Sequence, residues 1–148
     1  MNLANNIIKI IFLLLIPMVC WSQDAVHNYG NIQIHDDGIV GFYSIDKALT
    51  ISGGSNPVFY DFEVAVDNDL YVDNTVGVLN NANLIAGDII TSRVASEINI
   101  NFLNNLFYIG EGNNTKVDGY AAMSKKSEFT FPIGQYGKLR PLSIESIS

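Results

Sequence analysis

The sequence predicts an all-β fold, and three observations lead to that class. Apolar residues alternate with polar ones in short runs, as they do in strands that bury one face. Clusters of Asn, Asp and Gly separate these runs, and these residue types adopt the backbone conformations that turns require. No apolar stripe at i, i+3, i+4, i+7 persists over three helical turns. Short strands joined by frequent turns are typical of all-β domains.

The clearest predicted strand is 58–66. Its even-numbered positions, from Val58 to Val66, are apolar or aromatic, whereas Asp61 and Glu63 occupy odd-numbered positions. We therefore expect the even-numbered side chains, Phe62 among them, to form the core. The same period of two predicts further strands at 32–34, 70–72, 76–78, 98–102 and 129–133.

A spacing in the middle of the chain favours a β-solenoid over other all-β folds. Leu70, Leu84 and Ile98 recur every 14 residues, and the residues two positions after each repeat in step. Asn-containing turns lie between them, as at the corners of stacked rungs that bury their apolar faces against one another. An ordinary β-sandwich with evenly spaced hairpins stays open as the alternative.

The residues from Lys116 onward predict a second, incomplete β unit. Pro132 cannot donate to a strand ladder, so the strand that precedes it must end there or lie at an edge. A further strand begins at 138–144. We therefore expect solenoid-like rungs over 23–115 and part of a β-sandwich over 116–148, which would self-associate through its C-terminal edge.

The N-terminus predicts a signal peptide over 1–22. A start that carries Lys9 precedes the apolar run 10–19, which is shorter than the roughly 20 residues that a membrane-spanning helix needs. Cleavage after Ser22 fits the small side chains that precede it, whereas Val19 disfavours lipid attachment at Cys20. We expect an exported protein, extracellular or on the outer cell surface, with the periplasm as the alternative and no transmembrane span after cleavage. The mature chain lacks cysteine, so it forms no disulfides.

The charge distribution excludes some partners. The whole chain has a formal net charge of −7. The segment from Asp24 to Glu111 contains twelve acidic residues but only two basic ones, Lys47 and Arg93. Nucleic acids and anionic membranes require clustered Lys and Arg, so neither is an expected partner.

The sequence contains no pattern that predicts a catalytic or cofactor-binding site. It has no G-x-S-x-G motif, and no cysteine remains after cleavage to act as a nucleophile. His27 and His35 lack a nucleophile partner and the spacing of zinc ligands. We therefore assign no catalytic, cofactor-binding or zinc-binding residues.

One cluster of oxygen ligands is a candidate for calcium. Asp67, Asp69 and Asp73 lie close together with Asn68 and Asn74, and calcium prefers six to eight oxygen ligands. The spacing lacks the glycine and the glutamate of an EF-hand loop. A solvated turn is the favoured interpretation, and calcium is the alternative.

Two parts of the chain have patterns that recur in other proteins. The first covers 57–64, 69–72 and 83–91; the second covers 117–120, 129–134 and 139–142, with the pattern V-x-G-Y, F-x-F-P-x-G and R-P-L. Together they resemble a family of exported surface proteins of Bacteroidota, especially flavobacteria. Proteins of this family are cargo of type IX secretion or are associated with gliding motility. The resemblance implies that this chain is the N-terminal part of a larger exported protein. It departs from the family between Ile34 and Ser44, where it is shorter, and at Ser148, where relatives continue into a sorting domain.

Three function classes follow, in order of preference. The first is a non-enzymatic secreted or cell-surface protein with a structural or adhesin-like role, whose partners are other surface proteins. The second is a glycan-binding module, for which the exposed-ring candidates are Tyr43, Tyr71, Tyr108, Tyr120 and Tyr136. Among these, the residue at 71 is expected to point outward, because its neighbours at 70 and 72 are apolar. The third is a polysaccharide-acting enzyme of the β-helix type, with carboxylates paired at 61 and 63 or at 67 and 69.

Overall fold

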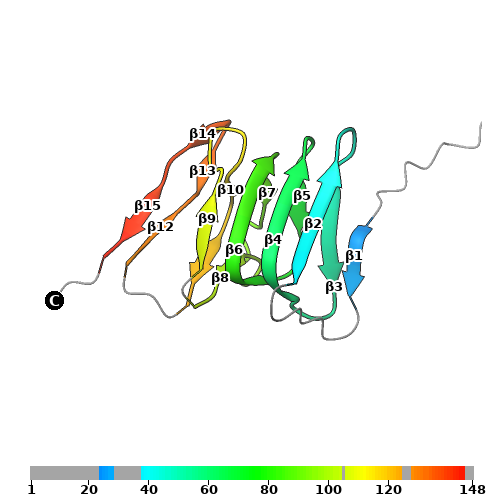
Figure 1. The fold of residues 1–148 in the computed structure, drawn as a ribbon, viewed down its shortest axis with the longest axis horizontal. Coiled ribbons are helices and arrows are strands. Elements are labelled where there is room, and N and C mark those ends of the chain that lie inside the picture. Colours follow the sequence, from blue (N-terminus) through cyan, green and yellow to red (C-terminus); the bar gives the residue numbers. More distant parts are fainter. Residues whose placement is uncertain (1–23, 29–37, 105, 125–127, 146–148) are drawn as a thin grey trace, which may run out of the picture.

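A computed structural model describes residues 24–28, 38–104, 106–124 and 128–145, and within 24–28 it describes the backbone. The predicted signal peptide, the predicted strand at 32–34 and His35 lie outside these residues. The described chain forms two large sheets, called sheet A and sheet B here, and two two-stranded sheets after them (Figure 1). Sheet A contains, in spatial order, β1 (Asp24–Asn28), β3 (Leu49–Gly53), β5 (Leu70–Val72), β7 (Ile89–Ile90) and β10 (Val117–Asp118). Sheet B contains β11 (Ala121–Met123), β8 (Ile100–Phe102), β6 (Val76–Ala86), β4 (Val58–Val66) and β2 (Ile39–Ser44), with β9 (Phe107–Ile109) paired to β6.

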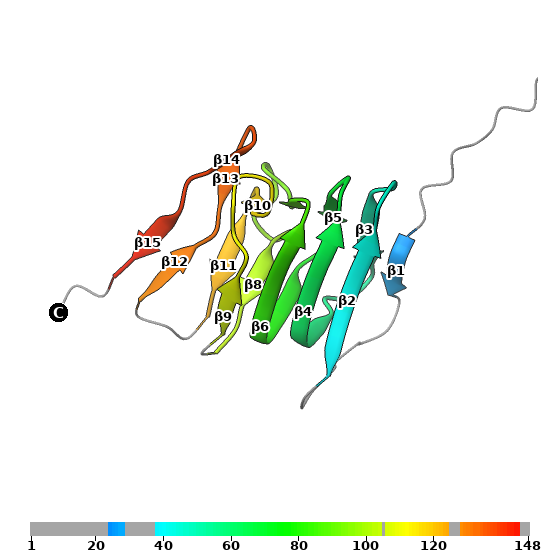
Figure 2. The same cartoon turned by 45° about the horizontal axis from the view of Figure 1, so that its top comes forward.

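The protein is a β-solenoid. Successive strands from β1 to β7 alternate between the two sheets, and every pairing within both sheets is parallel. The chain therefore winds round a common core, and each circuit lays one strand on each sheet (Figures 1 and 2). This confirms the predicted class, since a sandwich of the immunoglobulin type is built from antiparallel sheets.

The predicted 14-residue repeat is wrong, because the rungs are longer than 14 residues and differ in length. In sheet B, Ile39 pairs with Asp61, 22 positions later. In sheet A, Leu70 pairs with Ile89 after 19 positions, whereas Ile89 pairs with Val117 after 28. Leu70 and Leu84 belong to β5 and β6, which lie in opposite sheets. A rung contains two strands and two corners, and the corner loops vary in length.

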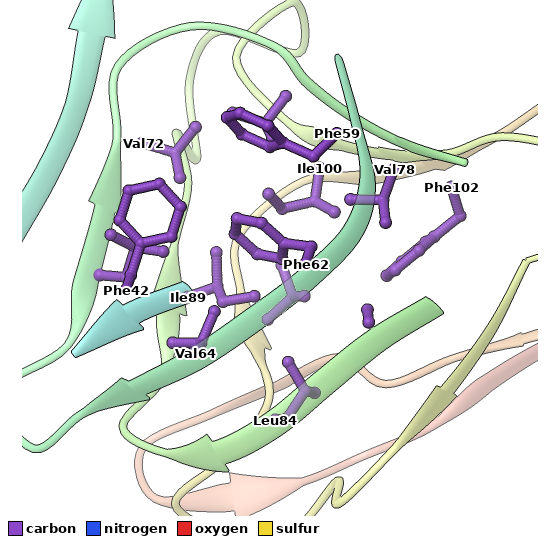
Figure 3. Packing of buried hydrophobic residues seen from close by; sticks show 14 of the residues in the cluster. Phe42, Phe59, Phe62, Val64, Val72, Val78, Leu84, Ile89, Ile100 and Phe102 are labelled. Atoms are coloured by element: carbon purple, nitrogen blue, oxygen red, sulfur yellow. The ribbon is translucent and has the colours of Figure 1, made fainter. Parts of the chain in front are cut away.

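The core lies between the two sheets. Figure 3 shows Phe62 and Leu84 of sheet B and Ile89 of sheet A gathered in this space, and all three are buried. Three phenylalanines form its aromatic centre. The rings of Phe59 and Phe62 are stacked with centroids 5.7 Å apart, and the ring of Phe42 lies 5.5 Å from that of Phe62. Burial of these side chains is the main favourable term in the stability of the solenoid.

The predicted alternation of 58–66 is right for its second half and wrong for its first. Phe62, Val64 and Val66 are buried, as expected. At the start of the strand, however, Phe59 is buried and Tyr60 only half-buried. The register between β4 and β6 shifts here, because Phe59 pairs with Val78 whereas Asp61 pairs with Asn81. β6 contributes one more residue than β4 between these two pairs, and the alternation of β4 changes at the same place.

The residues after 115 continue the solenoid before they form a hairpin. β10 extends sheet A and β11 extends sheet B, so both sheets cross the predicted domain boundary. The hairpin that follows is antiparallel and consists of β12 (Phe129–Phe131), β13 (Gly134–Gln135), β14 (Lys138–Leu139) and β15 (Leu142–Ile144). It caps the end of the rung stack (Figure 2).

Two sets of contacts dock this hairpin on the last rung. The buried rings of Phe129 and Phe131 lie 5.2 and 6.5 Å from the ring of Phe102. The backbone N–H of Val117 donates to the carbonyl of Pro132 at 2.8 Å. The hairpin therefore buries Phe129 and Phe131 of β12, whereas Leu142 and Ile144 of β15 stay exposed.

Candidate functional site: the outer face of sheet B

The outer face of sheet B carries two aligned rows of side chains. The first row runs across the strands through Ile39, Asp61, Asn81 and Phe107. The second row runs through Gly41, Glu63, Asn83 and Ile109. Because alternate residues of a strand point to opposite faces, both rows lie opposite the buried residues of β4. The result is a band of carboxylates and amides on β4 and β6 with apolar residues at its ends.

Tyr43 lies across this face instead of standing away from it. A Cβ atom at position 41 would overlap the Tyr43 ring, so the ring covers Gly41 of the same strand. The Tyr43 hydroxyl donates to Glu63 Oε1 on the neighbouring strand. The side chain is nevertheless 61% exposed. One side of the ring therefore rests against β2 while much of the remainder is open to solvent.

Two carboxylate–amide pairs hold the centre of the face in order. Asn83 Nδ2 donates to Glu63 Oε2 at 2.7 Å, and Asn80 Nδ2 donates to Asp61 Oδ1 at 2.7 Å. The hydrogen bonds from Tyr43 and then Asn83 lower the pKa of Glu63 below its ordinary value. The same contact with Glu63 raises the pKa of the Tyr43 phenol. Glu63 is therefore an ionised acceptor at neutral pH, and a general acid would need the opposite shift.

Exposed apolar side chains lie at both ends of the face. On β9, Phe107 is 54% exposed and Ile109 is about half exposed, and on β2 Ile39 is exposed. A recess beside Phe107 is lined in part by Thr130 and Ser143 of the hairpin. Phe107 and Ile109 are neighbours on one side of β9, and exposed apolar side chains that lie together with polar groups around them indicate a contact surface.

The calcium candidates do not form one site. Asp69 precedes β5 and Asp73 follows it, which separates their backbones by about 13 Å along an extended strand. Asp67 and Asp69 line one recess together with Asp88. Within the described ranges, no group of three or more His, Cys, Asp or Glu side chains is arranged to hold a metal ion.

Asp69 has a structural role at the corner that precedes β5 in sheet A. Asp69, Asp88 and Lys116 occupy equivalent positions in successive rungs, each immediately before a strand of sheet A. Asp69 Oδ1 accepts from the backbone N–H of Asp88 at 2.8 Å. Lys116 is fully buried, and its Nζ donates to Asp88 Oδ2 at 2.5 Å and to the carbonyl of Asn113 at 2.7 Å. These contacts fasten one rung to the next.

The other sequence candidates are distributed over the molecule. Tyr71 points outward from sheet A and is 42% exposed, as the alternation of β5 predicted. Tyr108 is structural, because its ring packs against Phe102 and Phe129 and its hydroxyl donates to the carbonyl of Thr130 at 2.6 Å.

The remaining sequence candidates are two tyrosines and one histidine. Tyr120 and Tyr136 are exposed, the latter in the turn of the C-terminal hairpin. His27 lies in β1.

Several residues of the site were not predicted from the sequence, namely Ile39, Gly41, Asn80, Asn81, Asn83, Phe107 and Ile109. Gly41 matters because it leaves room for the Tyr43 ring, and Phe107 matters because it lies on the outer side of β9. Phe107, Tyr108 and Ile109 are all apolar or aromatic, so no alternation in the sequence indicates which side chain faces the core.

Comparisons with protein-family models, with curated proteins and with solved structures found no match. In the part of the chain that the structure describes, no helix is long and apolar enough to cross a membrane.

Proposed function

We propose that this protein is a non-enzymatic, exported adhesin-like solenoid whose contact surface is the outer face of sheet B. The observation that carries the proposal is the composition of that face. Exposed Tyr43, Phe107 and Ile39 flank Glu63 and Asp61, whose carboxylates are fixed by hydrogen bonds to tyrosine and asparagine. Ordered polar groups beside exposed apolar ones favour binding to another molecule.

The proposal of a non-enzymatic role rests on how the charged groups are used. Hydrolysis of a glycosidic bond needs one carboxyl that is protonated and one that is ionised. Glu63 has a lowered pKa, which disfavours the protonated form. Lys116 pairs with Asp88, and Arg93, which follows β7, pairs with Asp118 of β10. These pairs join one rung to another, which is a structural use of charge.

The proposal of export rests on the sequence. The predicted signal peptide at 1–22 and the resemblance to exported Bacteroidota surface proteins both favour it. The proposed setting is the outer cell surface.

A bead-adhesion assay tests the proposed role. Beads coated with residues 23–148 are expected to bind fixed bacterial or host cells in a saturable way. The matched control is Gly87→Val, because a side chain at this position of positive φ would overlap the carbonyl of Val66 and prevent folding. Equal binding by both kinds of bead would overturn the adhesin-like role. Release of reducing ends from a polysaccharide panel would overturn the non-enzymatic role.

Export is tested separately by N-terminal sequencing of secreted material. We expect the mature protein to begin at Gln23 or within a residue or two of it. Lipid on Cys20 or retention of Met1 would contradict this expectation.

A further inference from the structure

We infer that the outer face of sheet B binds a neutral glycan chain that lies across the strands between Tyr43 and Phe107. This inference rests on the proposed contact role of that face and names the class of its ligand. Three features of the face carry it: an exposed aromatic ring at each end, polar groups between the rings that donate and accept hydrogen bonds, and the length and negative charge of the face.

The first feature is the placement of the aromatic rings. Tyr43 covers Gly41 and is anchored by its hydrogen bond to Glu63, so the ring is held in place before any ligand arrives. Phe107 is exposed on β9. Exposed aromatic rings offer flat apolar surfaces, and the C–H faces of pyranose rings are apolar in the same way. A ring that is already fixed loses little conformational entropy on binding.

The second feature is the chemistry between the rings. Asp61 and Glu63 are acceptors, and Asn80 and Asn83 supply amide groups that both donate and accept. Sugar hydroxyls also donate and accept, so they complement such pairs. Protein interfaces, in contrast, are depleted of charged residues at their centre. Carboxylates at the centre of this face therefore favour a hydroxyl-rich ligand over a protein.

The third feature is the distance across the face from β2 to β9 together with the negative charge of its centre. The sheet order places β4 and β6 between β2 and β9, so three strand spacings of about 4.8 Å give about 14 Å across the face. This length accommodates several sugar rings in a row. The carboxylates of Asp61 and Glu63 repel anionic chains, which selects neutral glycans over uronates or sulfated ones.

Affinity electrophoresis of the mature chain tests the inference. The probes are the neutral polysaccharides mannan, laminarin and xylan, with alginate as the acidic comparison. We expect at least one neutral polysaccharide to retard the protein and alginate to leave its mobility unchanged. Tyr43→Ala and Phe107→Ala are each expected to weaken the retardation by about threefold to tenfold, as loss of one aromatic contact would. Both side chains are exposed, so the variants keep the wild-type unfolding midpoint to within a small shift.

Tyr71→Ala is the matched control, because Tyr71 is also exposed but lies on the outer face of sheet A. It is expected to bind as the wild type does. Equal weakening by all three variants, or no weakening by Tyr43→Ala, would overturn the assignment to this face. Retardation by alginate alone would overturn the assignment of a neutral ligand. If no polysaccharide retards the protein while coated beads still adhere to cells, the assignment of a glycan ligand is wrong. The adhesin-like role would then be retained, with a protein as the partner.

Discussion

Replacing Phe59 with alanine tests the register of β4 most directly. Strict alternation along 58–66 would place Tyr60 in the core and Phe59 outside, whereas the structure buries Phe59 and leaves Tyr60 half-buried. Phe59 is only 2% exposed and contacts the rings of Phe42 and Phe62. Removing a buried phenylalanine costs about 3–5 kcal/mol, which includes the cavity that remains. We therefore expect Phe59→Ala to destabilise the protein as strongly as Phe62→Ala.

Urea unfolding followed by circular dichroism measures this cost. With a slope of about 2 kcal/mol/M, a loss of 3–5 kcal/mol lowers the midpoint by about 1.5–2.5 M. The matched variants are Tyr60→Ala, expected to cost about 1 kcal/mol, and Glu63→Ala on the outer face, expected to cost less than about 1 kcal/mol. A Tyr60→Ala protein less stable than Phe59→Ala would refute the register shift, because strict alternation would then describe the whole strand.

Three further predictions concern the corner, the outer face and the hairpin. Lys116→Met is expected to lower the free energy of unfolding by about 3 kcal/mol, because Asp88 then lacks its ion-pair partner. Adding Asp88→Asn should recover part of this loss. A double variant less stable than Lys116→Met alone would contradict this reasoning. Absorbance at 295 nm, compared between wild type and Tyr43→Phe, should show the Tyr43 phenol titrating above its ordinary pKa, and Glu63→Gln should bring it down. Because the pKa of Glu63 is depressed, ionised Glu63 contributes to folding stability above the ordinary glutamate pKa of about 4.3, and this contribution is lost as the pH falls through the depressed pKa. An unshifted titration of Tyr43 would show that its contact with Glu63 does not form in solution. β15 pairs only with β12 among the described strands, so sedimentation should detect concentration-dependent association that Leu142→Lys reduces, and a wild type that stays monomeric at high concentration would exclude it.

The contacts on the outer face of sheet B depend on how its strands pair. Tyr43 and Glu63 are 20 residues apart, and no local pattern connects them. They meet because β2 pairs with β4 in a register that sets Gly41 beside Glu63, and because Gly41 leaves space for the ring. Predicting this contact requires the register, which depends on loop lengths as well as on strand patterns. The sequence indicated Asp61 and Glu63 as a pair, but only their hydrogen-bonding partners indicate that Glu63 is held ionised.

By itself, the sequence determined the class of fold and much of the core. Alternation is a local property of a strand, so Phe62, Val64 and Val66 could be assigned to the core without knowing what they contact. Turn residues marked some strand ends, as at 67–69 between β4 and β5, because the required backbone conformations depend on the residue itself. The turn expected at Asn80 and Asn81 is wrong, since both residues lie inside β6.

Only the tertiary structure decided which strands are neighbours and which polar groups are buried. The rungs vary from 19 to 28 residues where Leu70, Ile89 and Val117 align, so no fixed period could reveal the stacking. Lys116 resembles a solvated residue at the start of a strand, yet it is fully buried. Asp88 of the previous rung neutralises its charge, and the absence of a side chain at Gly134 leaves room for its aliphatic stem. Charge burial depends on partners that are distant in sequence, and these partners exist only after the rungs have stacked.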